Sequence, residues 1–168
     1  MTERRTSLLA ALALLAMAAS WGSTFYLIHD LLRRVPAIDF LALRFSMGAV
    51  FLVILAPRAI GRLSASARKR AVVLGLLYGF GQILQTIGLA STPASVSGFI
   101  TGMYVVLTPV FAALILRSRI TGLTWVAVLL AISGIAVMTL TGFSIGYGQT
   151  LTLVASALYA LHIVGLGA

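Results

Sequence analysis

Polar side chains that could bind an organic solute stand inside long apolar runs of this sequence. The stretch FLALRFSMGAVF, residues 40–51, is apolar on both sides of Arg44. A guanidinium is always charged, and it can hold a carboxylate by two parallel hydrogen bonds. Arg44 is therefore a candidate to bind an acidic group of a small molecule.

A second group of polar residues follows one helical face. Tyr78, Gln82 and Gln85 are spaced i, i+4, i+7, which places them on the same side of a helix. One aromatic ring and two amides on a single face suit the wall of a path for organic solutes. The alternative is that the two amides join neighbouring helices by hydrogen bonds.

Three further residues are candidates on weaker grounds. Trp21 lies in the middle of an apolar run, where the role of an interface anchor is less expected, and Tyr104 lies near the middle of another. Both could line a cavity, with ordinary packing as the alternative. His162 is deep in the last apolar run, where a histidine could relay protons or could simply pack.

Composition decides the solvent that these residues meet. Of the 168 residues, 61% are hydrophobic and 9% are charged, whereas soluble domains carry about 25% charged residues. The chain therefore belongs in a lipid bilayer. The net charge is +9, but the basic residues lie between the apolar runs, so they indicate topology and no nucleic-acid partner is expected. The chain has no cysteine, which excludes disulfides, thiolate metal sites and a cysteine nucleophile.

Six apolar runs are each close to the length of a membrane-spanning helix, about 20 residues. Backbone groups in hydrocarbon must be satisfied within the segment, so we expect an all-α, polytopic membrane helix bundle. Proline marks several boundaries, and Pro109 inside the fourth run predicts a kink. The expected spans are residues 7–28, 38–56, 71–89, 94–116, 123–141 and 147–166.

Lysine and arginine predict the orientation of the bundle. Nine of them lie in the N-terminal tail and the loops on its side, and two, Arg33 and Arg34, lie in the loops of the other side. Cytoplasmic loops carry the excess of positive charge, so the N-terminus is expected in the cytoplasm and the protein in the cytoplasmic membrane. The first run stays apolar through residues 25–28, which favours a spanning helix over a secretory signal cleaved after Ala18.

The depth of Arg44 leaves two interpretations open. It lies six residues past the outer start of the second span, or roughly 9 Å below that end. The side chain could reach back to the interface, toward Asp39 or Asp30. It could instead face the bundle interior and line a wet cavity, since an arginine pointing at lipid is costly.

A weak internal repeat joins the first run to the sixth. AASWGSTF and SALYALHI can be set together with Trp21 against Tyr159. If the sixth run begins a second copy, the first copy holds five helices, residues 7–141. An odd number of spans inverts the second copy, which is a common architecture of secondary transporters.

The order of several motifs resembles a known family. WGSTF at residues 21–25 is followed by ALRF at 42–45, YGFGQILQTIGLASTPASVSGFI at 78–100, a proline in the fourth span, and TWVAVLLAISGIAVM at 124–138. Together they resemble the EamA-type branch of the drug/metabolite transporter superfamily over essentially the whole chain. The resemblance implies ten helices in two inverted repeats of five, of which this chain would hold the first repeat and one further helix.

The same resemblance implies a function, with one departure. Such proteins move small metabolites, such as amino acids or related compounds, across the cytoplasmic membrane, often outward. Relatives often carry an acidic residue in an LGE-like turn after the fourth helix, whereas this chain reads LRSRIT at residues 116–121. An ion pair made by that turn is therefore in doubt.

These observations predict an exporter or permease of small metabolites that works by alternating access. The expected partners are a small-molecule substrate and the bilayer, with a homodimer if the short chain is complete. No cofactor or metal is expected, and no HExxH, GxSxG or P-loop pattern supports an enzyme. The alternative is a non-transporting membrane scaffold or an inactive truncated fragment.

Overall fold

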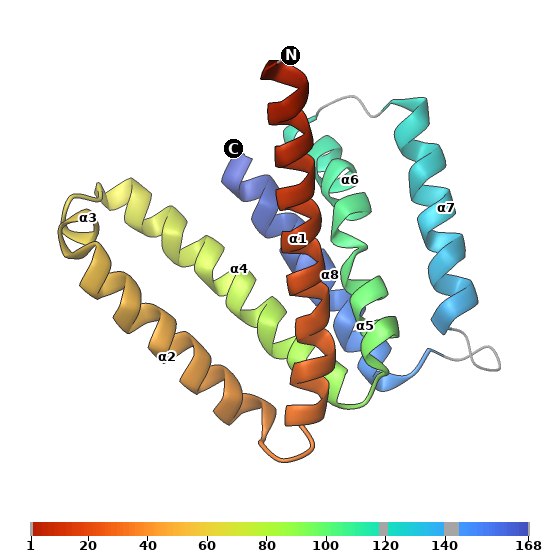
Figure 1. The fold of residues 1–168 in the computed structure, drawn as a ribbon, viewed down its shortest axis with the longest axis horizontal. Coiled ribbons are helices and arrows are strands. Elements are labelled where there is room, and N and C mark those ends of the chain that lie inside the picture. Colours follow the sequence, from red (N-terminus) through yellow and green to blue (C-terminus); the bar gives the residue numbers. More distant parts are fainter. Residues whose placement is uncertain (1, 118–120, 140–144, 168) are drawn as a thin grey trace.

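The fold is entirely helical over the residues that the computed structural model describes, which are 2–117, 121–139 and 145–167. Within them lie α1 (Thr2–Leu31), α2 (Ala37–Leu55), α3 (Pro57–Gly61), α4 (Ala65–Ala90), α5 (Ala94–Thr101), α6 (Tyr104–Leu116), α7 (Gly122–Thr139) and α8 (Tyr147–Gly167). Figure 1 shows the long helices side by side in a bundle, with α2 and α7 at opposite edges. The all-α prediction is confirmed.

Five segments are long and apolar enough to span a membrane, and they coincide with five of the six expected runs. The α5 and α6 helices together make one of these segments, Ala94–Leu116. The run expected over residues 123–141 forms α7, in which Gly122–Gly134 is a shorter apolar stretch. Residues 140 and 141 lie outside the described part of the chain. So do residues 118–120, which belong to the LRSRIT turn that differs from the family pattern.

Prolines and a serine mark where helices begin. Pro36 and Pro93 immediately precede α2 and α5, where the missing N–H of proline costs no internal hydrogen bond. Ser64 caps α4 by accepting a hydrogen bond from the Ala67 N–H at 3.2 Å. The end of α6 is less regular, because Arg117 adopts a left-handed conformation with φ of 52°, which glycine or asparagine more often supplies.

The fourth span is interrupted, but the break does not fall at the proline. It falls between Thr101 and Tyr104, where Gly102 and Met103 form a turn, while Pro109 lies inside α6. At this break the Ile100 carbonyl accepts two hydrogen bonds, one from the Met103 N–H at 3.0 Å and one from the Ser156 hydroxyl of α8 at 2.8 Å. The α8 helix thus contacts the fourth span at its discontinuity.

The core of the bundle lies where α8 packs against α4, α5 and α6, and α8 meets α4 most extensively. Side chains at this contact are small: Ala155, Ser156 and Ala160 are all fully buried. A Cβ placed on Gly88 would lie 2.5 Å from the Gly148 carbonyl oxygen. The backbones of α4 and α8 therefore touch at this point.

The outer helices leave most of their apolar surface uncovered by the chain itself. The 18-residue apolar windows of α1 and α2 are 0% and 6% buried, whereas those of α4 and α8 are each 33% buried. Large exposed apolar surface has to be covered, and the bilayer covers it for a membrane-spanning chain. The most exposed helices are α1, α2 and α7, while α8 is held inside.

The first and last spans run in opposite directions. In Figure 1, α1 descends from the N-terminus and α8 ascends to the C-terminus, so both ends of the chain lie at the same end of the bundle. The start of α4, which carries Arg68, Lys69 and Arg70, lies at that end as well. This arrangement is compatible with α8 opening an inverted second repeat.

Candidate functional site

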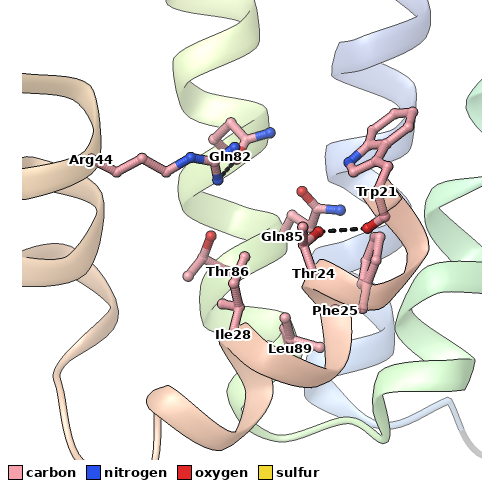
Figure 2. A pocket seen from close by; sticks show the side chains of 9 residues that line it. All are labelled: Trp21, Thr24, Phe25, Ile28, Arg44, Gln82, Gln85, Thr86 and Leu89. Atoms are coloured by element: carbon pink, nitrogen blue, oxygen red, sulfur yellow. Dashed lines mark hydrogen bonds between the residues drawn. The ribbon is translucent and has the colours of Figure 1, made fainter. Parts of the chain in front are cut away.

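Arg44 reaches from α2 across to α4. Its Nη1 donates a hydrogen bond to Oε1 of Gln82 at 3.3 Å, and Figure 2 shows the side chain extended toward α4. This bond points into the helix assembly and not toward Asp30 or Asp39, the alternative partners considered from the sequence. The chain leaves Arg44 exposed, whereas Gln82 is buried.

Gln82 passes this contact on to an aromatic group. Its Nε2 donates to the Tyr78 hydroxyl at 3.2 Å, one helical turn earlier. The Tyr78 ring packs against Tyr159 and His162 of α8, with centroid separations of 5.7 and 5.4 Å. A polar chain therefore runs from Arg44 on α2, through α4, to the rings of α8.

Gln85 is committed to a different set of bonds. Its Oε1 accepts from the Tyr159 hydroxyl at 2.7 Å, and its Nε2 donates to Thr101 Oγ1 at 2.9 Å. Thr101 in turn donates to the Ser97 carbonyl at 2.8 Å. All of these groups are buried, so Gln85 joins α4 to α5 and α8 at the centre of the core.

Two cavities meet at Trp21 and Gln82. The first, of about 30 Å³, lies between α1, α2 and α4, and the second, of about 120 Å³, lies between α1, α4, α6 and α8. Figure 2 shows the first, into which Arg44 and Gln85 also point. The second is lined by Trp21, Tyr78, Gln82, Tyr104, Tyr159, His162 and Ile163. The six residues expected at a substrate cavity thus border these two spaces.

The wall at Trp21 is built by α1 and the interrupted span. The Trp21 and Tyr104 rings lie 6.3 Å apart, and Tyr104 is the first residue of α6 after the break. A larger opening of about 420 Å³ between α1 and α5 is bordered by the same two residues. Trp21 is 48% exposed, so it presents one side to the cavities and another to the surroundings of α1.

His162 is fastened to the backbone of α4. Its Nδ1 lies 2.9 Å from the Leu74 carbonyl oxygen, to which it donates a hydrogen bond. The His162 side chain also lines the second cavity. His162 therefore has a defined structural contact, and its use as a proton relay remains a prediction.

Sequence reasoning missed two parts of this site. The sequence presents Tyr159 only as the repeat partner of Trp21. In the structure both residues line the same cavity, and the Tyr159 hydroxyl donates a hydrogen bond to Gln85. Ser97, Thr101, Thr152 and Ser156 form a polar seam between α5 and α8. The hydroxyls of Thr101, Thr152 and Ser156 donate to carbonyls one turn earlier, whereas the buried Ser97 hydroxyl has no hydrogen-bond partner among the described residues. A sequence cannot distinguish such residues from ordinary small helical residues.

Two GxxxG pairs of the sequence, Gly75 with Gly79 and Gly98 with Gly102, have the spacing that lets helix backbones approach closely, but they are not where the helices of this chain touch. A Cβ on Gly75 or Gly79 would meet nothing within 4 Å, and one on Gly98 would make only ordinary contact with the Phe25 ring. The close approaches occur at other positions, such as Gly81, Gly88 and Gly148. The GxxxG spacing alone does not say which face of a helix meets another helix.

The side chains around the two cavities are of types that bind an organic solute. Arg44 brings a positive charge that no acidic side chain of the described residues neutralises, the glutamines bring amide groups, and the aromatic residues bring flat apolar walls. Among the described residues, no three His, Asp or Glu side chains gather to hold a metal ion. Such a site would recognise a solute that has an acidic group and an apolar or planar body.

Comparison with known proteins places the chain in a family. Residues 8–140 match the EamA-like transporter family. An "Uncharacterized transporter" of Archaeoglobus fulgidus is 31% identical over 140 residues, which are 83% of this chain and 43% of that protein. The chain thus spans less than half the length of this relative, and no solved structure matches it. Because the family match covers most of this chain, the chain is a member of the EamA-like transporter family.

Proposed function

We propose that the chain forms half of the substrate path of a metabolite transporter and that the substrate carries a carboxylate. The observation that supports this most directly is the contact of Arg44 with Gln82 beside the two cavities. Arg44 uses one guanidinium nitrogen in this bond, so other donors are left to bind an oxyanion bidentately. The substrate class then includes amino acids and related small acids.

The uncovered side of Arg44 supports a second half of the path. A charged side chain at this depth is costly against hydrocarbon, so its exposed side has to face protein or water. The two cavities, of about 30 and 120 Å³, are also smaller than the roughly 300–1,000 Å³ of a typical ligand site. We infer that a second five-helix unit completes the cavity. Either α8 forms this unit together with a continuation of the chain, or a second copy supplies it in a homodimer.

The proposed mechanism is alternating access, in which the two units rock around the site and open it to each side in turn. The first unit is residues 7–141, and α8 begins an inverted second unit. The N-terminus lies in the cytoplasm, and the protein works in the cytoplasmic membrane as an exporter or permease. The antiparallel course of α1 and α8 and the basic start of α4 support this arrangement.

Arg44→Gln is the variant that tests the role of the charge. Glutamine keeps a polar side chain but removes the positive charge, so we expect uptake of carboxylate-bearing solutes by vesicles to fall about 10- to 150-fold, as for loss of a charged hydrogen bond. Membrane abundance should stay within about twofold, since substitutions that break no packing usually change stability little. The assay is uptake of labelled amino acids and small organic acids into vesicles that contain the full natural protein.

Two results would contradict the proposal. If Arg44→Gln lowers abundance and transport together, the residue holds the fold and does not select the solute. If the natural protein moves no solute at any concentration, the chain is a scaffold or an inactive fragment. Its intact mass in the native membrane decides between one longer chain and two copies, because a chain of 17.7 kDa has to find its second half in another molecule.

A further inference from the structure

Another concave surface lies outside the path between the helices, at the end of the bundle that carries the N-terminus. A groove of about 310 Å³ opens there between the start of α4 and the end of α8. It is lined by Lys69, Arg70, Val73, Leu74 and Gly165. None of these residues borders the cavities around Arg44.

The upper part of the groove carries positive charge that the chain does not neutralise. Lys69 and Arg70 are exposed, and neither forms an ion pair or side-chain hydrogen bond within the described part of the chain. The first turn of α4 contains no acidic residue, and Arg68 adds a third positive charge next to them. These charges are therefore available to bind an anion.

The lower part of the groove is apolar. Val73 is 50% exposed and lies one turn below Lys69, facing the surroundings of the bundle. On the opposite wall, a Cβ on Gly165 would lie 2.6 Å from the Leu74 side chain. The lack of a side chain at Gly165 therefore leaves space in the groove beside Leu74. The His162 bond to the Leu74 carbonyl fixes α8 against α4 just beneath.

Positive charge at one end and an apolar channel at the other match the two parts of a phospholipid. We propose that this groove binds an anionic phospholipid, with its phosphate between Lys69 and Arg70 and an acyl chain along Val73 and Leu74. The position of the basic pair next to the first apolar turn of α4 puts it at the depth of the headgroups. A soluble phosphate compound would satisfy the charges but would leave the apolar channel empty.

The test is thermal unfolding of the purified protein in detergent with added lipid. Phosphatidylglycerol should raise the melting temperature of the natural chain, and phosphatidylcholine with the same acyl chains should raise it much less. Lys69→Gln with Arg70→Gln should increase the half-saturating concentration of phosphatidylglycerol about 30-fold, because each basic residue near the surface contributes about 1 kcal/mol. The double variant Arg58→Gln with Arg62→Gln is the matched control, since it removes two charges from the segment that precedes α4 but none from the groove.

Val73→Trp provides an independent variant. It keeps every charge and fills the apolar channel, so it should also weaken the response to phosphatidylglycerol. This variant tests the proposal even if the double glutamine variant does not fold. Glycerophosphate, which is a headgroup without chains, should not replace the lipid. The proposal is overturned if Val73→Trp responds like the natural chain, if both double variants respond equally, or if phosphatidylcholine or glycerophosphate stabilises as well as phosphatidylglycerol.

Discussion

At the scale of single residues, Gln82 and Gln85 show that similar side chains on one face can have different roles. Gln82 bonds to Arg44 and Tyr78 at the edge of the cavities, where a solute could exchange for one of these partners. Gln85 is held by Tyr159 and Thr101 inside the core. This difference supports the proposal that Gln82 contacts the substrate, and it gives Gln85 the role of joining helices.

Gln85→Leu should lower the stability of the bundle, because it leaves the buried Tyr159 hydroxyl without its acceptor. The expected loss is about 0.6–2 kcal/mol, the range for hydrogen bonds between membrane helices. Tyr159→Phe should cost a similar amount, while the double variant should cost less than the sum of the two. Unfolding in mixed detergent measures all three, and strict additivity would show that the two side chains do not interact.

His162→Asn separates the structural role of the histidine from proton relay. The asparagine Nδ2 can replace Nδ1 in donating to the Leu74 carbonyl, but the asparagine amide cannot take up and release a proton as an imidazole can. We expect stability, transport rate and the pH profile of transport to be nearly unchanged. Normal folding combined with a lost pH dependence would instead identify His162 as a proton relay.

At the scale of helices, α8 is the element that organises the bundle. It contacts α4, α5 and α6, and its small buried residues allow the backbones to approach. Its side chains also supply the Tyr159 and Ser156 hydroxyls, which reach Gln85 and the break in the fourth span. Helices in a membrane associate through such close packing and polar contacts, because lipid gives them no hydrophobic reason to do so.

Gly148→Ala should disturb this contact strongly. The new methyl group would lie 2.5 Å from the Gly88 carbonyl oxygen, and a backbone atom cannot move aside as a side chain can. We expect a loss of about 1–3 kcal/mol, the usual cost of overpacking. Gly79→Ala is the control, since its methyl group would meet nothing within 4 Å and should leave thermal stability in detergent unchanged or slightly raised. Equal effects of the two variants would mean that α4 and α8 do not touch at Gly148.

At the scale of the whole molecule, the chain covers its inner helices far more than its outer ones. The inner helices α4 and α8 bury a third of their apolar windows, whereas α1 and α2 bury almost nothing against the rest of the chain. Arg44 lies on one of these uncovered helices. Both facts are expected of a unit whose open side meets either lipid or a second unit.

The proposed orientation can be checked by labelling, because the chain has no cysteine of its own. Ser66→Cys near the start of α4 should react with a membrane-impermeant maleimide only after the cells are opened. Ser95→Cys near the start of α5 should react in intact cells, since α4 crosses the membrane between the two positions. The opposite pattern would place the N-terminus outside, and equal labelling of both would mean that α4 does not span.

Much of the fold could be predicted from the sequence for a simple physical reason. Hydrocarbon excludes unpaired backbone groups and charges, so the length of each apolar run and the positions of the prolines and basic loops already indicate where helices cross. The order of motifs from WGSTF to the fifth run was also sufficient to indicate the family, which the match over residues 8–140 confirms.

Tertiary structure alone decided which polar residues meet. The i, i+4, i+7 spacing placed Tyr78, Gln82 and Gln85 on one face, but only the packing of α8 shows that Gln85 turns to Tyr159 while Gln82 turns to Arg44. The break in the fourth span at Gly102, away from Pro109, likewise depends on contacts with another helix. Local sequence determines where a membrane helix forms, because the solvent is the same for every segment. It does not determine the rotation of that helix or its neighbours, because these depend on how side chains from distant parts of the chain fit together.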